Sequence, residues 1–332
     1  MALDGCRREV VVTLPSARRR FVVFGAGVLG SLYAARLAAA GYDVTLVARG
    51  RRLADLREHG LIVEDAASGE RSVTRSVRFV DAIPPGETFA CCLVLVRTTQ
   101  LAEALPVLAE AEGVATFVVM VNNAEGPDEI VRALGRERVL LGFANAGGER
   151  DGEVVRVMVS RRSPVTLGEL DGRVSERLTM VAQAFRDAGA AVRFESDMDA
   201  WLRHHVAVVG PFANALYAVG TDNRALAADR DTLRLALRAV REAVGVVRAH
   251  GHPVRPPVLR ALLAIPDALV LPLLRRLVAL PIMDVGGARH ARAARDEMDA
   301  LNAELAALAR SAGVDTPAMD ALASRAAQGR RR

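Results

Sequence analysis

The sequence predicts an α/β fold, in which an N-terminal doubly wound sheet is followed by an all-helical C-terminal part. Three observations favour this class. Strand and helix patterns alternate over the first half, a glycine-rich turn joins the first strand to the first helix, and helical periodicity alone continues from about residue 196. A chain of 332 residues can build two cores. We expect an extension at 1–19, the sheet domain at 20–195, the helical domain at 196–326 and a basic tail at 327–332.

The first strand runs directly into a glycine-rich turn. Phe21 to Phe24 are apolar and strand-forming, and an alanine-rich helical pattern follows at 31–40. The turn between them has the pattern G-x-G-x-x-G, formed by Gly25, Ala26, Gly27, Val28, Leu29 and Gly30. The first glycine permits a tight turn, the second lets backbone approach a pyrophosphate, and the third lets the helix pack against the sheet. We therefore predict a Rossmann-type dinucleotide site formed by these six residues; the alternative is a similar turn without a ligand.

The second strand indicates which dinucleotide is bound. Tyr42 to Ala48 have strand character, and Arg49 follows them, where an NAD-selective site would place Asp or Glu. A guanidinium can bind the 2′-phosphate of NADP(H) bidentately, whereas a carboxylate would repel it. We therefore predict NADP(H) rather than NAD(H). The alternative is a solvated arginine cluster at the start of a helix.

Further alternation completes the predicted sheet domain. Hydrophobic period and turn residues place each element. In order, we expect a helix near 52–59, strands near 61–64, 72–79 and 91–96, a helix near 100–110, a strand at 115–121, a helix near 127–134, strands at 139–143, 153–159 and 165–167, a helix at 175–188 and a strand at 191–194.

The second half has helical periodicity throughout. We expect helices at 197–217, 230–250 and 288–312, and a helical region at 258–280 that prolines divide. A cofactor domain joined to a helical domain places a substrate cleft between the two. The apolar residues of 258–280 fit three roles that the sequence leaves open, namely lining the cleft, forming a homodimer contact, or packing in the core.

Composition excludes several classes of protein. The chain is 51% hydrophobic and 25% charged, which is typical of soluble globular proteins. All 44 basic residues are arginine, but the formal charge is only +5 and aromatic residues make up 4%, so we expect no nucleic-acid binding. No run of about 18 apolar residues predicts a membrane span, and the first 20 residues lack the apolar core of a signal peptide.

Cysteine and histidine usage points to a reduced compartment without a metal site. Cys6, Cys91 and Cys92 form no disulfide framework, and the adjacent pair lies in an apolar run that predicts a buried strand. The histidines form no recognisable ligand set with thiols or carboxylates. We expect a cytoplasmic protein with no bound metal.

Seven further segments stand in a characteristic order, namely GAGVLG at 25–30, VLVRTTQ at 94–100, VNNAEG at 121–126, LLGFANAGGERDG at 140–152, DAWLR at 199–203, NAL at 214–216 and RDEMDALN at 295–302. With these segments, the sequence resembles the ketopantoate reductase family over residues 20 to about 318. The resemblance implies reduction of 2-dehydropantoate, or of a related 2-oxo acid, with NADPH.

The resemblance also implies roles for individual residues. Asn123 corresponds to the asparagine beside the nicotinamide and the reacting carbonyl, and Glu297 to a glutamate at the cofactor's ribose. Gly148 falls where backbone meets the cofactor, and Asn214 and Asn223 fall near asparagines that contact substrate. Three of these residues also have a local alternative. Asn123 would cap the following turn, Glu297 would be a solvated helix position, and Asn214 would form hydrogen bonds with nearby backbone.

The sequence departs from the family where the reaction needs a proton. The resemblance places the family's proton-donating lysine at Arg203, a nucleotide-binding lysine at Arg97, and a substrate-binding serine near Val285. An arginine stays charged and donates protons poorly, although it can clamp an alkoxide or a carboxylate. A shift of one residue along the helix would instead bring His205 to the lysine's place.

Three outcomes follow for function. In the first, Arg203 stabilises the oxyanion while water, His204 or His205 delivers the proton. In the second, the protein reduces a different carbonyl or an imine. In the third, it is a non-catalytic NADP(H)-binding sensor. We favour an NADPH-dependent reductase of a small 2-oxo acid or related carbonyl, with Arg203, Asn123 and His205 as the catalytic candidates.

Overall fold

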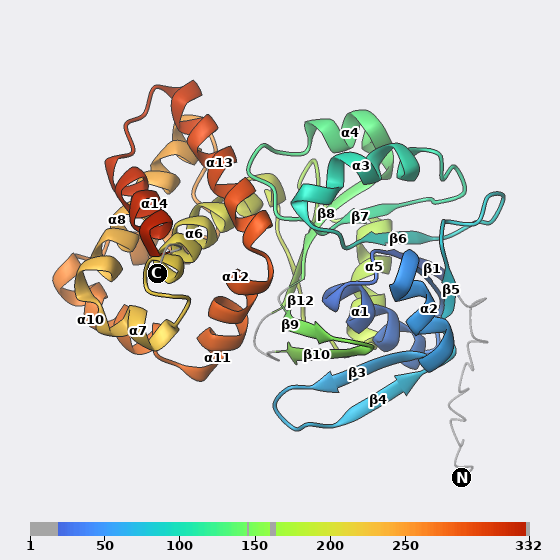
Figure 1. Ribbon diagram of the computed structural model, residues 1–332. Helices are drawn as coiled ribbons and strands as arrows, with labels where there is room; N and C mark the ends of the chain where they lie inside the picture. Colours follow the sequence, from blue (N-terminus) through green and yellow to red (C-terminus); the bar gives the residue numbers. More distant parts are fainter. Residues whose placement is uncertain (1–18, 145, 160–163, 330–332) are drawn as a thin grey trace, which may run out of the picture.

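The computed structural model describes residues 19–144, 146–159 and 164–329. Two parts lie side by side, an α/β domain formed by the N-terminal half and a helical domain formed by the C-terminal half (Figure 1). The fold class predicted from the sequence is thus confirmed. Residues 1–18, which include Cys6, and residues 330–332 lie outside the described residues.

A large mixed sheet forms the centre of the α/β domain, with the strand order β12-β11-β8-β7-β6-β1-β2-β5. Six neighbouring strands of this order are parallel, namely β8, β7, β6, β1, β2 and β5. Strand β11 pairs with β8 in the antiparallel direction. The strands are β1 (Arg20–Phe24), β2 (Asp43–Val47), β5 (Arg78–Val80), β6 (Cys91–Val94), β7 (Phe117–Val119), β8 (Val139–Phe143), β11 (Val165–Glu169) and β12 (Val192–Phe194). The order reverses between β1 and β6, and ligands of such sheets bind outside the carboxyl ends of the strands at this point.

Helices cover both faces of this sheet, which explains why its central strands are almost entirely apolar. One face packs against α1 and α5, and the other against α3 and α4. The helices are α1 (Val28–Ala39), α2 (Gly50–His59), α3 (Thr98–Ala109), α4 (Asp128–Leu134) and α5 (Glu176–Asp187), with a short 3₁₀ turn at Arg136–Arg138. The predicted buried strand at Cys91 and Cys92 is confirmed, and burial raises the pKa of both thiols.

A second, four-stranded sheet lies beside α1, with the order β4-β3-β10-β9. Its strands are β3 (Leu61–Asp65), β4 (Arg71–Thr74), β9 (Ala146–Asp151) and β10 (Val154–Val159). The single strand predicted near 72–79 is therefore wrong, because the segment divides into β4 and β5. The former pairs with β3 and the latter with β2, and such distant pairing leaves no trace in local periodicity.

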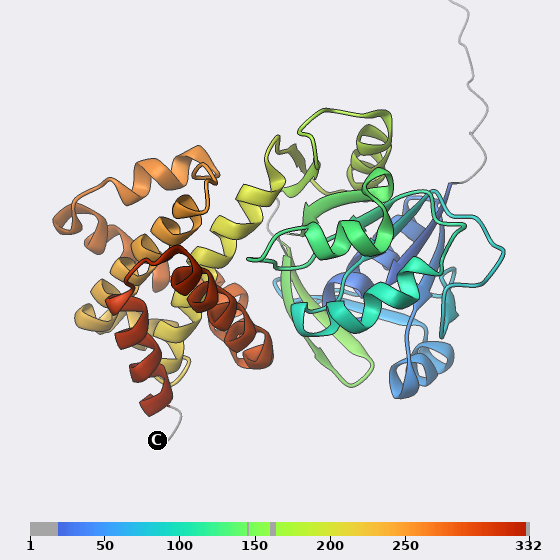
Figure 2. The ribbon, with the colours of Figure 1, turned by 90° about the horizontal axis from the view of Figure 1, so that it is seen from above.

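The helical domain is built around α6, which runs from the α/β domain into the C-terminal half (Figure 2). Its helices are α6 (Met198–Ala218), α7 (Asn223–Ala228), α8 (Arg230–Ala249), α9 (Pro257–Leu263), α10 (Asp267–Val278), α11 (Pro281–Met283), a π-helical turn (Asp284–Arg289), α12 (His290–Ala293), α13 (Arg295–Ala312) and α14 (Pro317–Gly329). The helix predicted at 288–312 is interrupted at Ala294. The sequence did not predict α14, which packs on α6 and α8 and includes three residues of the predicted basic tail.

The α9–α10 segment carries an exposed apolar surface. Val258, Leu262, Leu269, Leu273 and Leu277 are each at least 42% exposed. No residue of 258–280 lines the cleft described below, so that one of the three predicted roles is wrong. The homodimer stays a prediction.

Within the described residues, no single helix has both the length and the apolarity to cross a membrane. The pair α9 and α10 satisfies these criteria only when taken together, and the two helices are bent by 119° at their break.

Candidate functional site

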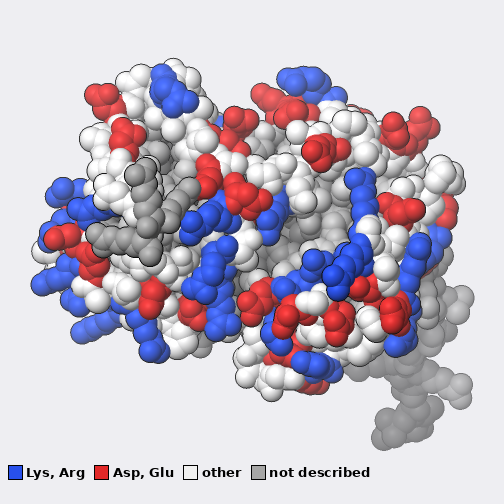
Figure 3. Space-filling view, viewed as in Figure 1, with Lys and Arg blue, Asp and Glu red and all other residues white. Residues whose placement is uncertain are grey.

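A cleft of about 990 Å³ lies between the two domains (Figure 3). The α/β domain lines it with the carboxyl ends of β1, β2 and β6 and with the β9 strand. The helical domain lines it with α6 and with the segment from the π-helical turn to α13. The cleft therefore lies where the strand order of the large sheet reverses, which is where such sheets bind ligands.

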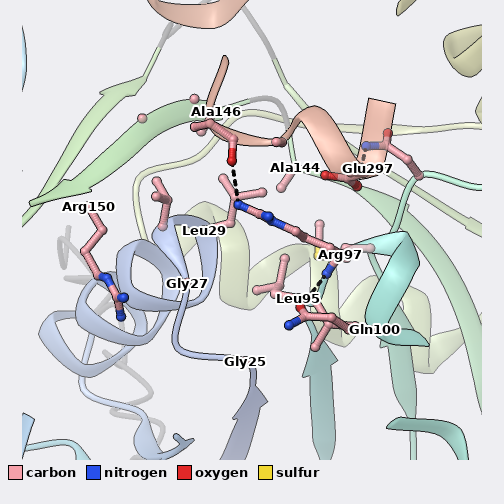
Figure 4. Close-up of a pocket in the computed structure, with 18 of the residues that line it drawn as sticks. Gly25, Gly27, Leu29, Leu95, Arg97, Gln100, Ala144, Ala146, Arg150 and Glu297 are labelled. Carbon is pink, nitrogen blue, oxygen red and sulfur yellow. Dashed lines mark hydrogen bonds between the residues drawn. The ribbon is translucent and has the colours of Figure 1, made fainter. Parts of the chain in front are cut away.

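The glycine turn occupies the floor of this cleft (Figure 4). Gly25 has a φ of +108°, and a Cβ there would lie 2.4 Å from the carbonyl oxygen of Leu95. A Cβ on Gly30, which lies behind the lining residues, would come within 1.8 Å of the Gly25 carbonyl oxygen. A Cβ on Gly27 would meet no atom within 4 Å. Gly25 and Gly30 are thus required by close packing, whereas Gly27 borders open space at the N-terminus of α1, where backbone N–H groups favour anions.

Two arginines in the cleft have no acidic partner among the described residues. Arg49 follows β2 and begins α2, and Arg150 comes from β9. Arg52 lies nearby but is buried, donating to Ser31 Oγ and to the Glu153 carbonyl. Burial, and next the charge of Arg150, lower the pKa of Arg52. This concentration of unneutralised guanidinium groups favours a phosphate-bearing ligand.

Arg97 reaches across the cleft from the end of β6 (Figure 4). Its guanidinium donates to both carboxylate oxygens of Asp296, at 3.0 and 3.2 Å, and to the Ala293 carbonyl at 2.9 Å. Arg97 therefore links the two domains at the cleft, a contact that the sequence did not reveal.

Gly148 lies on β9 where that strand approaches the first turn of α1. A Cβ at this position would come within 2.1 Å of the Arg156 carbonyl oxygen and 2.9 Å of a methyl carbon of Val28. The residue lines the cleft, so only a glycine lets β9 form the cleft wall this close to the glycine turn.

An amide and a carboxylate form a hydrogen-bonded pair in the cleft. Asn122 Nδ2 donates to Glu297 Oε1 at 3.2 Å, and the same oxygen accepts from the Thr98 N–H at 3.5 Å. Glu297 is only 5% exposed, so it is not the solvated helix position that one interpretation offered. Asn122 Oδ1 is buried and accepts no hydrogen bond among the described residues. A buried acceptor without a donor at a cleft wall suits a ligand that brings one.

Asn122 was not singled out from the sequence, and its neighbour Asn123 was. Asn123 does not line the cleft. Its Oδ1 accepts from the N–H groups of Glu125 and Gly126, both at 2.9 Å, and its Nδ2 donates to the Gly126 carbonyl at 2.5 Å. These contacts fit the local interpretation of Asn123 as a turn cap, and its catalytic and cofactor roles stay predictions. Successive residues of an extended segment face opposite sides, so only one of the two neighbouring asparagines can face the cleft. In this structure that residue is Asn122.

Arg203 lies on α6 beside the loop after β7. It is 9% exposed and does not line the cleft. Its guanidinium donates to Asp199 Oδ1 at 2.8 Å and to the carbonyls of Ala124 and Glu125 at 2.6 and 2.7 Å. These acceptors engage three of the five N–H groups of the guanidinium, and the oxyanion clamp stays a prediction. The guanidinium fastens α6 to the loop after β7.

Of the histidine pair, only His205 lines the cleft. Its ring is parallel to that of Trp201, with centroids 5.4 Å apart, and 4.2 Å from the ring of Phe143. His204 is fully buried, with Nδ1 2.7 Å from the Ala200 carbonyl, and burial lowers its pKa. Because neighbours on a helix face different directions, one histidine is structural and the other lies at the site.

The two asparagines assigned to substrate lie elsewhere. Asn214 is buried on α6 without lining the cleft. Asn223 Nδ2 donates to the carbonyls of Val278 and Leu280, at 2.8 and 3.3 Å, and so holds the end of α10. The contacts of Asn223 are structural, and the substrate role of Asn214 stays a prediction. The side chain of Val285 is outside those described.

A second carboxyl that the sequence did not reveal lies behind the cleft. Glu304 on α13 accepts from the Ala124 N–H at 3.2 Å. Burial, reinforced by the nearby charges of Glu125 and Glu297, raises its pKa from 4.5 to about 7. The loop after β7 is therefore held from both sides, by Arg203 on its carbonyls and by Glu304 on an N–H.

We expect this carboxyl to make stability fall as pH rises from about 4.5 to about 7. Within that window the folded protein binds a proton that the unfolded chain has released, so raising the pH favours unfolding. Glu304→Gln removes the effect, since the amide still accepts from Ala124. Urea unfolding at pH 5 and pH 8 should show a smaller loss of stability in this variant than in the parent protein. The control Glu110→Gln, at an exposed position, should lose as much stability as the parent protein. An equal loss of unfolding free energy between pH 5 and pH 8 in all three proteins would contradict the assignment.

The chain is similar in sequence to known proteins. A sequence model of the family described as Ketopantoate reductase PanE/ApbA matches residues 21–172. A 2-dehydropantoate 2-reductase of Archaeoglobus fulgidus is 32% identical over 203 residues, which are 60% of this chain and 64% of that relative. A 2-dehydropantoate 2-reductase of Mesorhizobium japonicum is 28% identical over 260 residues, 68% of this chain and 77% of the relative. The chain therefore spans slightly less than two thirds of the first relative's length.

Solved structures share the whole fold. A 2-dehydropantoate 2-reductase from Geobacter metallireducens has a TM-score of 0.73 at 20% identity, covering 93% of this chain and 99% of the other. D-mandelate dehydrogenase in a ternary structure with NADH and anilino(oxo)acetate has a TM-score of 0.74 at 15% identity, covering 94% and 98%. At these identities the likeness concerns the fold.

Proposed function

We propose that this chain, which is similar to the ketopantoate reductase family over residues 21–172, is an NADPH-dependent oxidoreductase that reduces a small 2-oxo acid, or a related carbonyl compound, by hydride transfer. One observation supports the proposal most. A single cleft joins a glycine turn with open space above Gly27 to a wall that carries His205, and the polar pair Asn122 and Glu297 lies in the same cleft.

The residues present fit the nucleotide. Gly27 leaves room for a pyrophosphate at the N-terminus of α1, and the free acceptor Oδ1 of Asn122 suits a ribose hydroxyl or the carboxamide of a nicotinamide. Arg49 would bind the 2′-phosphate of NADPH, and the charge of Arg150 adds to the attraction for its phosphates. Bound NADPH would supply the hydride.

The chain's own residues must then supply a proton. Hydride addition to a carbonyl leaves an alkoxide, which needs a nearby acid. Arg203 is engaged away from the cleft and His204 is buried, so we assign the proton to the ring of His205. The ring stacked on Trp201 and beside Phe143 is held in one orientation, which favours transfer to a fixed position.

The function is tested by following NADPH oxidation with a panel of 2-oxo acids. We expect turnover with at least one of them, and formation of the 2-hydroxy acid with one NADP⁺ per product. Tight NADPH binding, measured by calorimetry, without turnover across the panel would support the non-catalytic sensor instead. An absence of any binding would contradict both functions.

His205→Phe tests the assignment of the proton donor. Phenylalanine keeps the aromatic contacts with Trp201 and Phe143 but has no proton to give. We expect kcat to fall by about 100-fold or more, with an unchanged dissociation constant for NADPH and a changed pH profile of kcat. His204→Phe is not suitable as a control because that side chain is fully buried. His59→Phe, at an exposed position, is the control and should leave kcat unchanged. If His205→Phe keeps the parent's pH profile, the assignment is wrong.

Arg49→Ala tests the choice of nucleotide. Loss of a guanidinium at the 2′-phosphate should raise the KM for NADPH by about 10-fold to 100-fold, while the KM for NADH changes little because NADH lacks that phosphate. Arg51→Ala, two residues further along the chain and outside the cleft lining, should leave both constants unchanged. Equal effects of Arg49→Ala on the two nucleotides would remove Arg49 from the 2′-phosphate site.

A further inference from the structure

The helical domain presents an almost wholly apolar wall to the cleft. On α6, the residues His205, Val209, Phe212 and Leu216 follow one another at spacings of three and four, so they lie on one helix face. Apart from His205 and Glu297, every described side chain that this domain contributes to the cleft lining is apolar or absent, and these residues are Val209, Phe212, Ala213, Leu216, Gly287, Ala291, Ala293, Ala294 and Met298.

The amides of this domain are turned away from the cleft. Asn214 is buried without lining it, and Asn223 is committed to the end of α10. Asn302 donates to the Gly210 and Met298 carbonyls, at 3.1 and 2.8 Å. Among the described residues, the helical wall therefore offers no amide that could accept from or donate to a hydroxyl on a substrate's side chain.

Flat rings border the same wall. The rings of Trp201 and His205 stack, and the ring of Phe143, at the end of β8, lies tilted against both. The ring of Phe212 lies beside Gly287, where an added Cβ would be 3.2 Å from a ring carbon. Gly287 thus keeps the segment before α12 close to this ring. Such surfaces favour contact with branched or planar apolar groups.

We propose that the substrate is a 2-oxo acid with a branched or aromatic side chain that carries no hydroxyl group. The inference rests on the proposed function and adds the class of substrate. A hydroxyl buried against this wall would lose its hydrogen bonds to water without replacement. The cost of an unpaired buried polar group, about 1–3 kcal/mol, corresponds to roughly 10-fold to 100-fold discrimination.

Two acids that differ by one hydroxyl test this class. Trimethylpyruvate has the carbon skeleton of 2-dehydropantoate but lacks its terminal hydroxyl. With NADPH, we expect kcat/KM to be at least about tenfold higher for trimethylpyruvate, and phenylglyoxylate to be reduced as well. A higher kcat/KM for 2-dehydropantoate would overturn the inference while leaving the proposed function intact.

Binding provides a readout that does not need turnover. When the protein is saturated with NADP⁺, calorimetry should show that trimethylpyruvate binds more tightly than 2-dehydropantoate. Val209→Asn places an amide on the cleft face of α6 and should lower the preference for trimethylpyruvate, whereas Val258→Asn, at an exposed position on α9, should not. An unchanged preference in Val209→Asn would contradict the role of the wall. If no 2-oxo acid binds or reacts, the proposed function fails first, and the substrate class with it.

Discussion

Gly27→Ala is expected to abolish nucleotide binding at micromolar concentrations while leaving the melting temperature unchanged. A Cβ on Gly27 meets no protein atom within 4 Å, so the folded chain has room for it. That room is the space at the N-terminus of α1 where a pyrophosphate would contact backbone N–H groups. A methyl group there separates the phosphate from its donors, and we expect the dissociation constant for NADPH to rise by at least about 100-fold, or roughly 3 kcal/mol.

Gly30→Ala is the matched control, because it adds the same methyl group three residues away. Its Cβ would come within 1.8 Å of the Gly25 carbonyl oxygen, so this variant should lose stability, with a melting temperature lowered by several degrees. Calorimetric binding and thermal unfolding of both variants give the comparison. If Gly27→Ala binds NADPH as tightly as the parent, the nucleotide does not lie over the glycine turn, and the cofactor proposal is wrong.

The fold was predictable where the signal is local. The apolar run before Gly25, the glycine turn and the alanine-rich helix after it are contiguous in sequence, and the structure has β1, the turn and α1 at those residues. The second sheet was not predictable in the same way. Its strands β3 and β10 lie about 90 residues apart and pair in parallel, so only tertiary contacts define it.

The site was predictable to the level of the element but not of the side chain. The sequence predicts a place at the site for Arg49, Gly148, His205 and Glu297, and all four line the cleft. A motif gives the segment, and only the backbone direction gives the side that each residue faces, so the motif does not distinguish Asn122 from Asn123. Glu304 carries no local signal, because its hydrogen-bond partner Ala124 lies 180 residues away in the sequence.

Arg203→Met is expected to destabilise the protein rather than to block the chemical step. The guanidinium is 9% exposed and donates to Asp199 and to the carbonyls of Ala124 and Glu125. Methionine fills similar space but leaves these acceptors unpaired, which should cost about 3 kcal/mol of unfolding free energy. Gly126→Ala should act in the same direction, because its Cβ would collide with Arg203 Nη2.

The same variant separates a structural role from catalysis. Below its melting temperature, the loop after β7 keeps the Asn123 cap and the hydrogen bond from Thr98 Oγ1 to the Asn122 carbonyl. Asn122 should therefore stay at the cleft, and kcat should fall by no more than about tenfold, which is less than the loss on removing a direct oxyanion donor. Urea unfolding and single-turnover rates at 15 °C measure the two quantities. A melting temperature equal to that of the parent, together with a loss of about 1,000-fold in kcat, would show that Arg203 contacts the reacting oxygen after all, since only a group that stabilises the transition state has that signature.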